Sequence, residues 1–188
     1  MAFLPSTCQT GIVARLAASI LVAVLGSAPD AVAADVSEDD VKLALLYKIT
    51  RFIEWPEHDH DDFLLCIAGA DTFDSAKRRL TVRSVGERAI RPVLVKDDLT
   101  SIHCDALYIA RTEADRIPEL TRSVRDLPVL TVSDAPGFAS DGGLIGLTTR
   151  NSRIQININV AASKRAGLTI SSQLLELARI VGDRQAKL

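Results

Sequence analysis

The 188-residue sequence contains few of the residues on which several classes of function depend. Aromatic residues make up only 4% of the chain, and its 22 lysines and arginines do not exceed its 24 acidic residues. Nucleic-acid binding uses a basic excess and, on single strands, aromatic side chains that stack on bases. The composition therefore argues against nucleic acid as a partner. The formal net charge of −2 gives no general attraction to anionic lipid either.

Long hydrophobic runs are also lacking, apart from one near the N-terminus. Residues 16–26 (LAASILVAVLG) are apolar, but a membrane-spanning helix needs roughly 20 such residues. Arg15 precedes the run, and the small residues Ala31, Ala33 and Ala34 follow it. This order is typical of a secretory signal, so we expect residues 1–33 to be removed by cleavage between Ala33 and Ala34. The alternative is an N-terminal membrane anchor that is not cut.

Cysteine is scarce, and its positions fit export. Cys8 would leave with the signal, so the remaining residues 34–188 contain only Cys66 and Cys104. In an oxidising compartment, these two residues are candidates for a disulfide. Two buried, reduced cysteines are the alternative, and the sequence alone favours neither. The length of residues 34–188 is that of one domain.

The apolar patterns of residues 34–188 predict an α/β fold. Val41, Leu45, Ile49 and Phe52 recur at helical spacing after Ser37, a favourable N-cap residue, which predicts a helix that ends near Trp55. The other expected helices lie at residues 71–82 and 113–126, and strands are expected at residues 63–68, 88–95, 105–110 and 128–132. This alternation is typical of a parallel sheet with helices on its faces.

The pattern changes towards the C-terminus. Residues 144–148 and 154–160 predict a β-hairpin, residues 161–165 a helical turn, and Ser171 or Ser172 the start of a last helix that includes Val181. The fold prediction is therefore a single α/β domain with a largely parallel sheet flanked by helices and a C-terminal β-hairpin and helix.

No group of residues predicts a catalytic centre, a cofactor site or a metal site. His58 and His60 lie in an acidic segment, residues 57–62 (EHDHDD), and we interpret it as a solvated loop because metal sites normally draw ligands from several elements. A metal-dependent hydrolase using both histidines is the alternative. His103 and Cys104 are neighbours, and neighbouring side chains in an extended segment point to opposite sides. A thiol–imidazole dyad is therefore not expected.

The ordered set of segments resembles one family, the YfiR/HmsC-like periplasmic proteins. The segments that carry the resemblance are YKITRFIEWP (residues 47–56), CIAG (66–69), CDALYIA (104–110), PVLTVSD (128–134), GF (137–138), GGLI (142–145), ININ (156–159) and KRAGLTISSQLL (164–175). Together they span roughly residues 38–181. The resemblance implies a regulatory protein rather than an enzyme.

In particular, it implies a periplasmic repressor. Such a protein binds the periplasmic sensor region of an inner-membrane diguanylate cyclase and thereby lowers cyclic di-GMP and biofilm formation. The resemblance further implies an outer-membrane lipoprotein as a competing partner, a homodimer, and a Cys66–Cys104 disulfide. Residues 144–160 contain no cysteine, so a second bridge known in the family is missing. The candidate partner surfaces are the exposed side of the first helix and the loops near Trp55 and Phe138, and a role in the core or in a hinge is the alternative for each.

A second hypothesis uses the residues alone. Gly69, Ala70 and Asp71 follow an expected strand, and loops in this position bind ligands in many open α/β sheets. A periplasmic small-ligand-binding module that serves a histidine kinase or an outer-membrane receptor is therefore the alternative function.

Overall fold

The computed structural model describes residues 37–56, 60–96, 99, 103–151 and 153–182. The expected signal, with its cleavage site at Ala33 and Ala34, lies outside these residues, and so does His58. The helices are α1 (Glu38–Thr50), α2 (Ala70–Leu80), α3 (Ile117–Ser123), α4 (Val160–Arg165) and α5 (Ser172–Leu177), with 3-10 turns η1 (Arg111–Arg116) and η2 (Phe138–Asp141).

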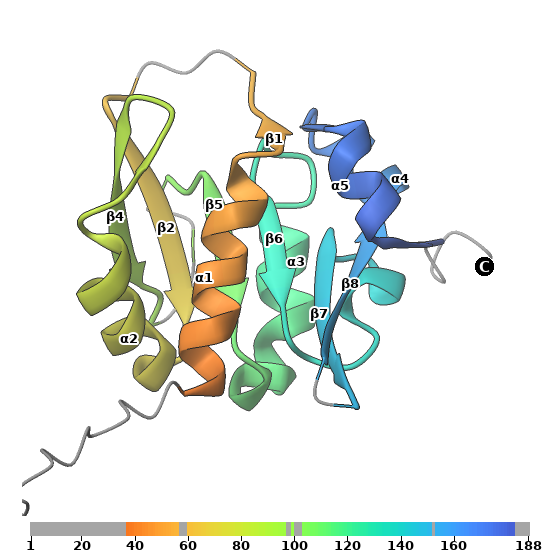
Figure 1. Ribbon diagram of the computed structural model, residues 1–188, viewed down its shortest axis with the longest axis horizontal. Helices are drawn as coiled ribbons and strands as arrows, with labels where there is room; N and C mark the ends of the chain where they lie inside the picture. Colours follow the sequence, from red (N-terminus) through yellow and green to blue (C-terminus); the bar gives the residue numbers. More distant parts are fainter. Residues whose placement is uncertain (1–36, 57–59, 97–98, 100–102, 152, 183–188) are drawn as a thin grey trace, which may run out of the picture. The chain divides into compact units, whose positions relative to one another are not determined.

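Eight strands form one sheet with the order β10-β8-β7-β6-β5-β2-β4-β3 (Figure 1). They are β2 (Asp62–Ala68), β3 (Ser84–Val85), β4 (Arg88–Leu94), β5 (Ala106–Ile109), β6 (Leu130–Ser133), β7 (Ile145–Arg150), β8 (Arg153–Asn159) and β10 (Arg179–Val181). The five central strands, from β4 to β7, run parallel, whereas β8 is antiparallel to β7. The predicted largely parallel sheet and the C-terminal hairpin are thus confirmed.

Two further strands form a separate pair. β1 (Ile53–Glu54) pairs antiparallel with β9 (Thr169–Ile170), with Ile53 opposite Ile170. The Ser171 N–H also donates to the Phe52 carbonyl at 2.9 Å. These hydrogen bonds hold the segment after α1 against the C-terminal part of the domain.

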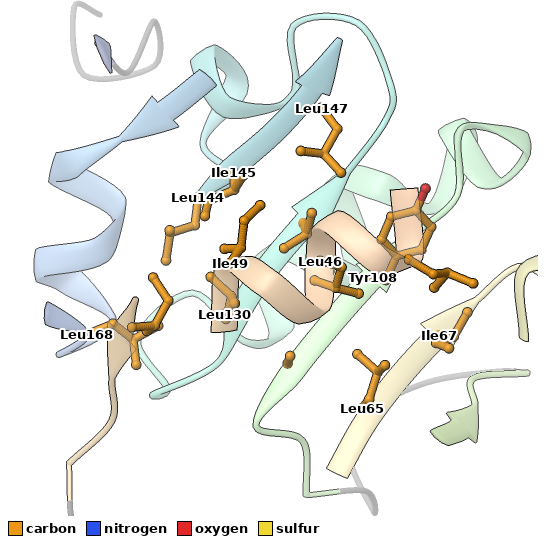
Figure 2. Packing of buried hydrophobic residues seen from close by; sticks show 14 of the residues in the cluster. Leu46, Ile49, Leu65, Ile67, Tyr108, Leu130, Leu144, Ile145, Leu147 and Leu168 are labelled. Atoms are coloured by element: carbon orange, nitrogen blue, oxygen red, sulfur yellow. The ribbon is translucent and has the colours of Figure 1, made fainter. Parts of the chain in front are cut away.

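Alternate residues of the central strands face two different cores. In β2, Phe63, Leu65 and Ile67 belong to one core, whereas Cys66 and Ala68 belong to the other. This alternation follows from the two-residue period of a strand that is covered on both faces. Helices α1 and α2 lie over the first core, as Figure 2 shows for α1, and α3 lies over the second.

Helix α1 is positioned by its cap and its buried face. The Ser37 hydroxyl accepts a hydrogen bond from the Asp40 N–H at 3.1 Å, which satisfies one free donor of the first turn. Leu43, Leu46 and Ile49 are at most 1% exposed and pack on the sheet. Of the expected stripe, Ile49 is in the core, but Val41 is 44% exposed. The predicted face is thus confirmed for most of its residues, since Leu45 and Phe52 also pack against the core, whereas Val41 at its start faces solvent.

Three predicted helices differ from those in the structure. The first ends at Thr50 rather than near Trp55, because the next residues form β1. The third does not begin at Glu113; a 3-10 turn precedes α3, which starts at Ile117 with Pro118 in its first turn, where a missing N–H is harmless. The last helix ends at Leu177, and Arg179–Val181 form β10, which pairs with β8.

Candidate functional site

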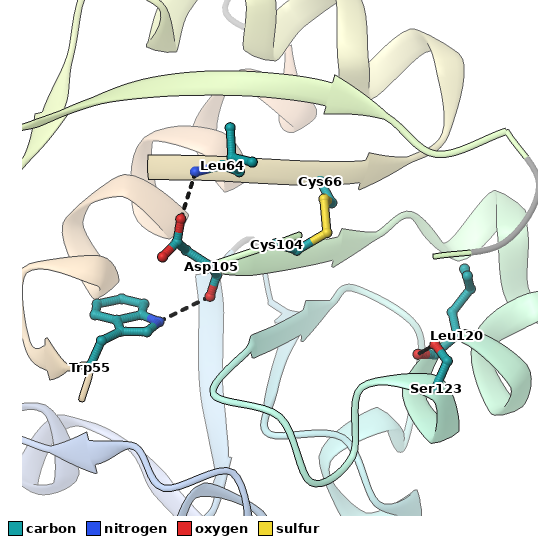
Figure 3. The surroundings of a disulfide bond; sticks show 7 residues. All are labelled: Trp55, Leu64, Cys66, Cys104, Asp105, Leu120 and Ser123. Atoms are coloured by element: carbon teal, nitrogen blue, oxygen red, sulfur yellow. Dashed lines mark hydrogen bonds between the residues drawn. A yellow bond between two sulfur atoms is a disulfide. The ribbon is translucent and has the colours of Figure 1, made fainter. Parts of the chain in front are cut away.

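A disulfide joins Cys66 in β2 to Cys104, which precedes the neighbouring strand β5 (Figure 3). The two Cα atoms are 5.8 Å apart, and both side chains are buried, at 0% and 5% exposure. They lie in the second core with Leu120 and Val124 of the helix α3 region. The bridge therefore ties the start of β5 to β2, and its buried sulfur atoms do not form a reactive centre.

Asp105, the residue after Cys104, organises the amino ends of the strands. Its carboxylate accepts hydrogen bonds from the Leu64 N–H at 2.7 Å and from the Arg88 guanidinium at 2.8 Å. The Trp55 indole N–H donates to the Asp105 carbonyl at 3.0 Å (Figure 3). The Trp55 ring also meets Phe63 edge-on, with 5.2 Å between ring centroids. Trp55 is half-buried, and these contacts give it a structural role in addition to the predicted role in partner binding.

Replacing Trp55 by phenylalanine tests the structural role. The variant keeps an aromatic ring beside Phe63 but loses the hydrogen bond to the Asp105 carbonyl, so we expect the free energy of unfolding to fall by about 1 kcal/mol. Urea denaturation measures this change, and the Trp55→Ala variant, which also loses the ring contact, should be clearly less stable. Equal stability of the wild type and both variants would contradict the structural role.

The second predicted partner residue, Phe138, is only 3% exposed. Its ring packs so closely on Gly143 that a Cβ atom there would lie 2.2 Å from the ring. Phe138 itself therefore offers little surface, although the loop around it remains a predicted contact region. Beside the ring, a hollow of about 350 Å³ opens between this loop and Ile117 and Arg125 in the α3 region.

Charged groups gather at the carboxyl ends of β5 and β6. The Lys42 ammonium of α1, on a side chain 4% exposed, lies 2.6 Å from the carboxylate of Asp134 and 2.9 Å from that of Glu38. Asp134 also accepts a hydrogen bond from the Arg111 N–H at 2.8 Å. Burial raises the pKa of the nearby Tyr108 phenol, and the negative charge of Asp134 raises this pKa further.

The pKa values of the cluster show which charge states are favoured. Burial by itself lowers the pKa of Lys42, but the hydrogen bonds and charges of Asp134 and Glu38 outweigh it, so that this pKa is raised. The hydrogen bond from Lys42 lowers the pKa of Glu38. The ammonium and the carboxylate therefore stay charged at neutral pH. Lys42 and Glu38 thus keep their usual charged forms, and the cluster holds the start of α1 by ion pairs.

The loop that carried the ligand-binding alternative lies against the end of the neighbouring strand β5. Gly69 follows β2 and has a φ of +126°, and a Cβ atom there would lie 2.7 Å from the Cβ of Ala110, which follows β5. These are the adjacent strand ends at which the crossover direction reverses, where open α/β sheets usually bind ligands. The two chain segments therefore lie close together, and the small-ligand hypothesis at Gly69 stays a prediction.

Of the remaining sequence candidates, the structure describes His60, His103 and Cys104. Within the described residues, no three histidine, cysteine or carboxylate side chains converge as ligands for a metal ion. His103 does not form a dyad with a free thiol, because Cys104 is in the disulfide. The same residues include no helix of sufficient length and apolarity to cross a bilayer. The structure does bring His60 and His103 together, which the sequence did not predict.

Comparison with known protein families gives a match that covers most of the described domain. The model of the YfiR/HmsC-like family matches residues 39–179. The match begins in the first turn of α1 and ends at the first residue of β10. It includes both cysteines of the disulfide, Trp55 with its contacts to Asp105 and Phe63, and the Phe138 loop.

Proposed function

Because this chain belongs to the YfiR/HmsC-like family, a family of periplasmic regulators of diguanylate cyclases, we propose that it is a repressor of one such enzyme. It binds the periplasmic sensor region of an inner-membrane diguanylate cyclase, keeps the enzyme inactive, and so lowers cyclic di-GMP and biofilm formation. The observation that carries the proposal is the family match over residues 39–179. An outer-membrane lipoprotein competes for the repressor, and a cleaved signal delivers it to the periplasm.

The chemistry of the described residues supports a binding role. Asp105 has donors on both carboxylate oxygens, and Asp134 is paired with Lys42. Tyr108 is buried in the core at 1% exposure. An enzyme needs acid, base and nucleophilic groups that converge on an accessible space. Asp105, Asp134 and Tyr108 instead make contacts within the domain or are buried in it.

The exposed side of α1 is the part of the predicted partner surface with the most accessible side chains. Val41, Ala44, Lys48 and Arg51 are all exposed and recur at a spacing of three or four residues, opposite the buried stripe of Leu43, Leu46 and Ile49. This face carries an exposed valine near the start of the helix and two cationic side chains at its end, Lys48 and Arg51. We therefore place the contact with the cyclase on this face.

A deletion strain provides the first test of the proposed function. Loss of the gene should raise cellular cyclic di-GMP and biofilm formation, and the immobilised mature protein should capture a membrane protein with a diguanylate cyclase domain from solubilised membranes. Unchanged cyclic di-GMP together with unchanged biofilm in the deletion strain would overturn the proposal.

Charge reversal on α1 tests the location of the contact. The Val41→Glu, Lys48→Glu variant should retain its thermal midpoint but lose capture of the cyclase and fail to complement the deletion. The matched control is Lys77→Glu, Val82→Glu, which makes the same two kinds of change at exposed residues in and just after α2. If the α1 variant represses as well as the control, the contact is not on α1.

A further inference from the structure

Two histidines that are distant in sequence lie side by side in the structure. The rings of His60 and His103 have centroids 4.6 Å apart, and their planes are inclined by 62°. His60 lies just before β2, and His103 lies just before Cys104 and β5. Both side chains are exposed. The pair therefore presents two imidazoles to solvent at the amino ends of adjacent strands.

The surrounding backbone holds these two positions together. Strands β2 and β5 pair directly, with Leu65 opposite Ala106. The Asp105 N–H donates to the Leu64 carbonyl at 2.9 Å, and the Asp105 carboxylate accepts from the Leu64 N–H. The disulfide fixes Cys104, the residue next to His103, to β2. The two histidines thus directly precede segments that strand pairing, hydrogen bonds and the disulfide hold together.

The spacing of the rings suits two imidazoles that share one metal ion. A metal–nitrogen bond of about 2.0–2.1 Å puts each ring centre about 3.1 Å from the ion. Two such rings at a right angle around the ion have centres about 4.5 Å apart, and two at the tetrahedral angle have centres about 5 Å apart. The observed 4.6 Å lies within this interval.

We propose that His60 and His103 form a binding site for a borderline divalent transition-metal ion, with Cu²⁺ bound more tightly than Ni²⁺ or Zn²⁺. The order follows from the general affinity series of divalent ions for nitrogen ligands. Within the described part of the chain, no third histidine, cysteine or carboxylate joins the pair. Such a site is open to solvent, exchanges its ion readily, and does not depend on repression of a cyclase.

Titration of the untagged mature protein with CuCl₂, NiCl₂ and ZnCl₂ tests the site. Calorimetry should give one ion per chain, and His60→Ala and His103→Ala should each weaken Cu²⁺ binding by about tenfold or more. The matched control is His58→Ala, which removes the third histidine of the chain and should change the affinity less than about twofold. Electron paramagnetic resonance of the Cu²⁺ complex should show two coupled nitrogens in the wild type and one in each single variant.

Three outcomes would overturn the proposal. The first is a lack of binding at millimolar Cu²⁺. The second is an affinity that His103→Ala leaves unchanged, because this result would place the ion elsewhere. The third is a loss of binding with His58→Ala but not with His103→Ala, which would locate the ion in the acidic loop alone. Near-wild-type thermal midpoints of the histidine variants would show that the loss of binding is not a loss of folding.

Discussion

Replacing Cys66 and Cys104 by alanine is expected to lower the free energy of unfolding by about 3–4 kcal/mol. The bridge joins residues 38 positions apart in the chain. In the loop-entropy account, a cross-link of this length lowers the conformational entropy of the unfolded chain and thereby stabilises the folded state by about this amount. Between the two cysteines lie α2, β3 and β4. Without the bridge, the unfolded chain gains freedom over this whole segment.

Chemical denaturation of oxidised and reduced protein measures this effect without mutation. The reduced wild type should unfold at a lower urea concentration than the oxidised wild type, and the double alanine variant should not respond to reductant. The variant also loses two sulfur atoms from a core in which Cys66 is fully buried, so it should be slightly less stable than the reduced wild type. Coinciding curves for oxidised and reduced wild type would contradict the prediction.

Replacing Lys42 by methionine should cost about 3–5 kcal/mol, although methionine preserves most of the volume of the side chain. The substitution leaves the carboxylate of Asp134, on a side chain that is 6% exposed, without its cation, and a buried charge that loses its partner is strongly destabilising. The first turn of α1 also loses its contact with the carboxyl ends of β5 and β6.

Two matched variants isolate the charge. Lys48→Met removes an exposed lysine from the same helix and should change stability by less than about 0.5 kcal/mol. Adding Asp134→Asn to Lys42→Met removes the uncompensated carboxylate, while the asparagine oxygen still accepts from the Arg111 N–H, so the double variant should recover much of the loss. A double variant that is no more stable than Lys42→Met would show that the cost has another origin.

The sequence predicted the central sheet well because its strands are buried on both faces. Phe63–Ala68 is a continuous apolar run, and such a run indicates a strand in a parallel sheet. The ends of helices were predicted less well. Nothing local in the sequence shows that Ile53 and Glu54 pair with a strand near residue 170, and the end of α1 depends on that distant partner.

The charged cluster at Lys42 and the histidine pair could not be predicted either, because each joins residues that are distant in sequence. Lys42 and Asp134 meet only because α1 crosses the ends of β5 and β6, and His60 meets His103 only because β2 and β5 are neighbours. A lysine in an amphipathic helix otherwise indicates an exposed face, and a single histidine carries no spacing pattern. The buried Trp55–Asp105 contact could have been suspected from the tryptophan alone, since a half-buried indole N–H usually finds an acceptor.

The β1–β9 pair joins the two ends of the domain, so it can form only late in folding. Helix α1 is among the first elements of the domain, yet Ile53 at its far end closes on Ile170, almost at the last described strand. A chain that emerges from its N-terminus cannot complete this closure until nearly all of it is available, and contacts between such distant residues slow folding. Until then, Ile53 and Glu54 have no strand partner, so a truncation that removes Thr169 and Ile170 should leave this segment open to proteases.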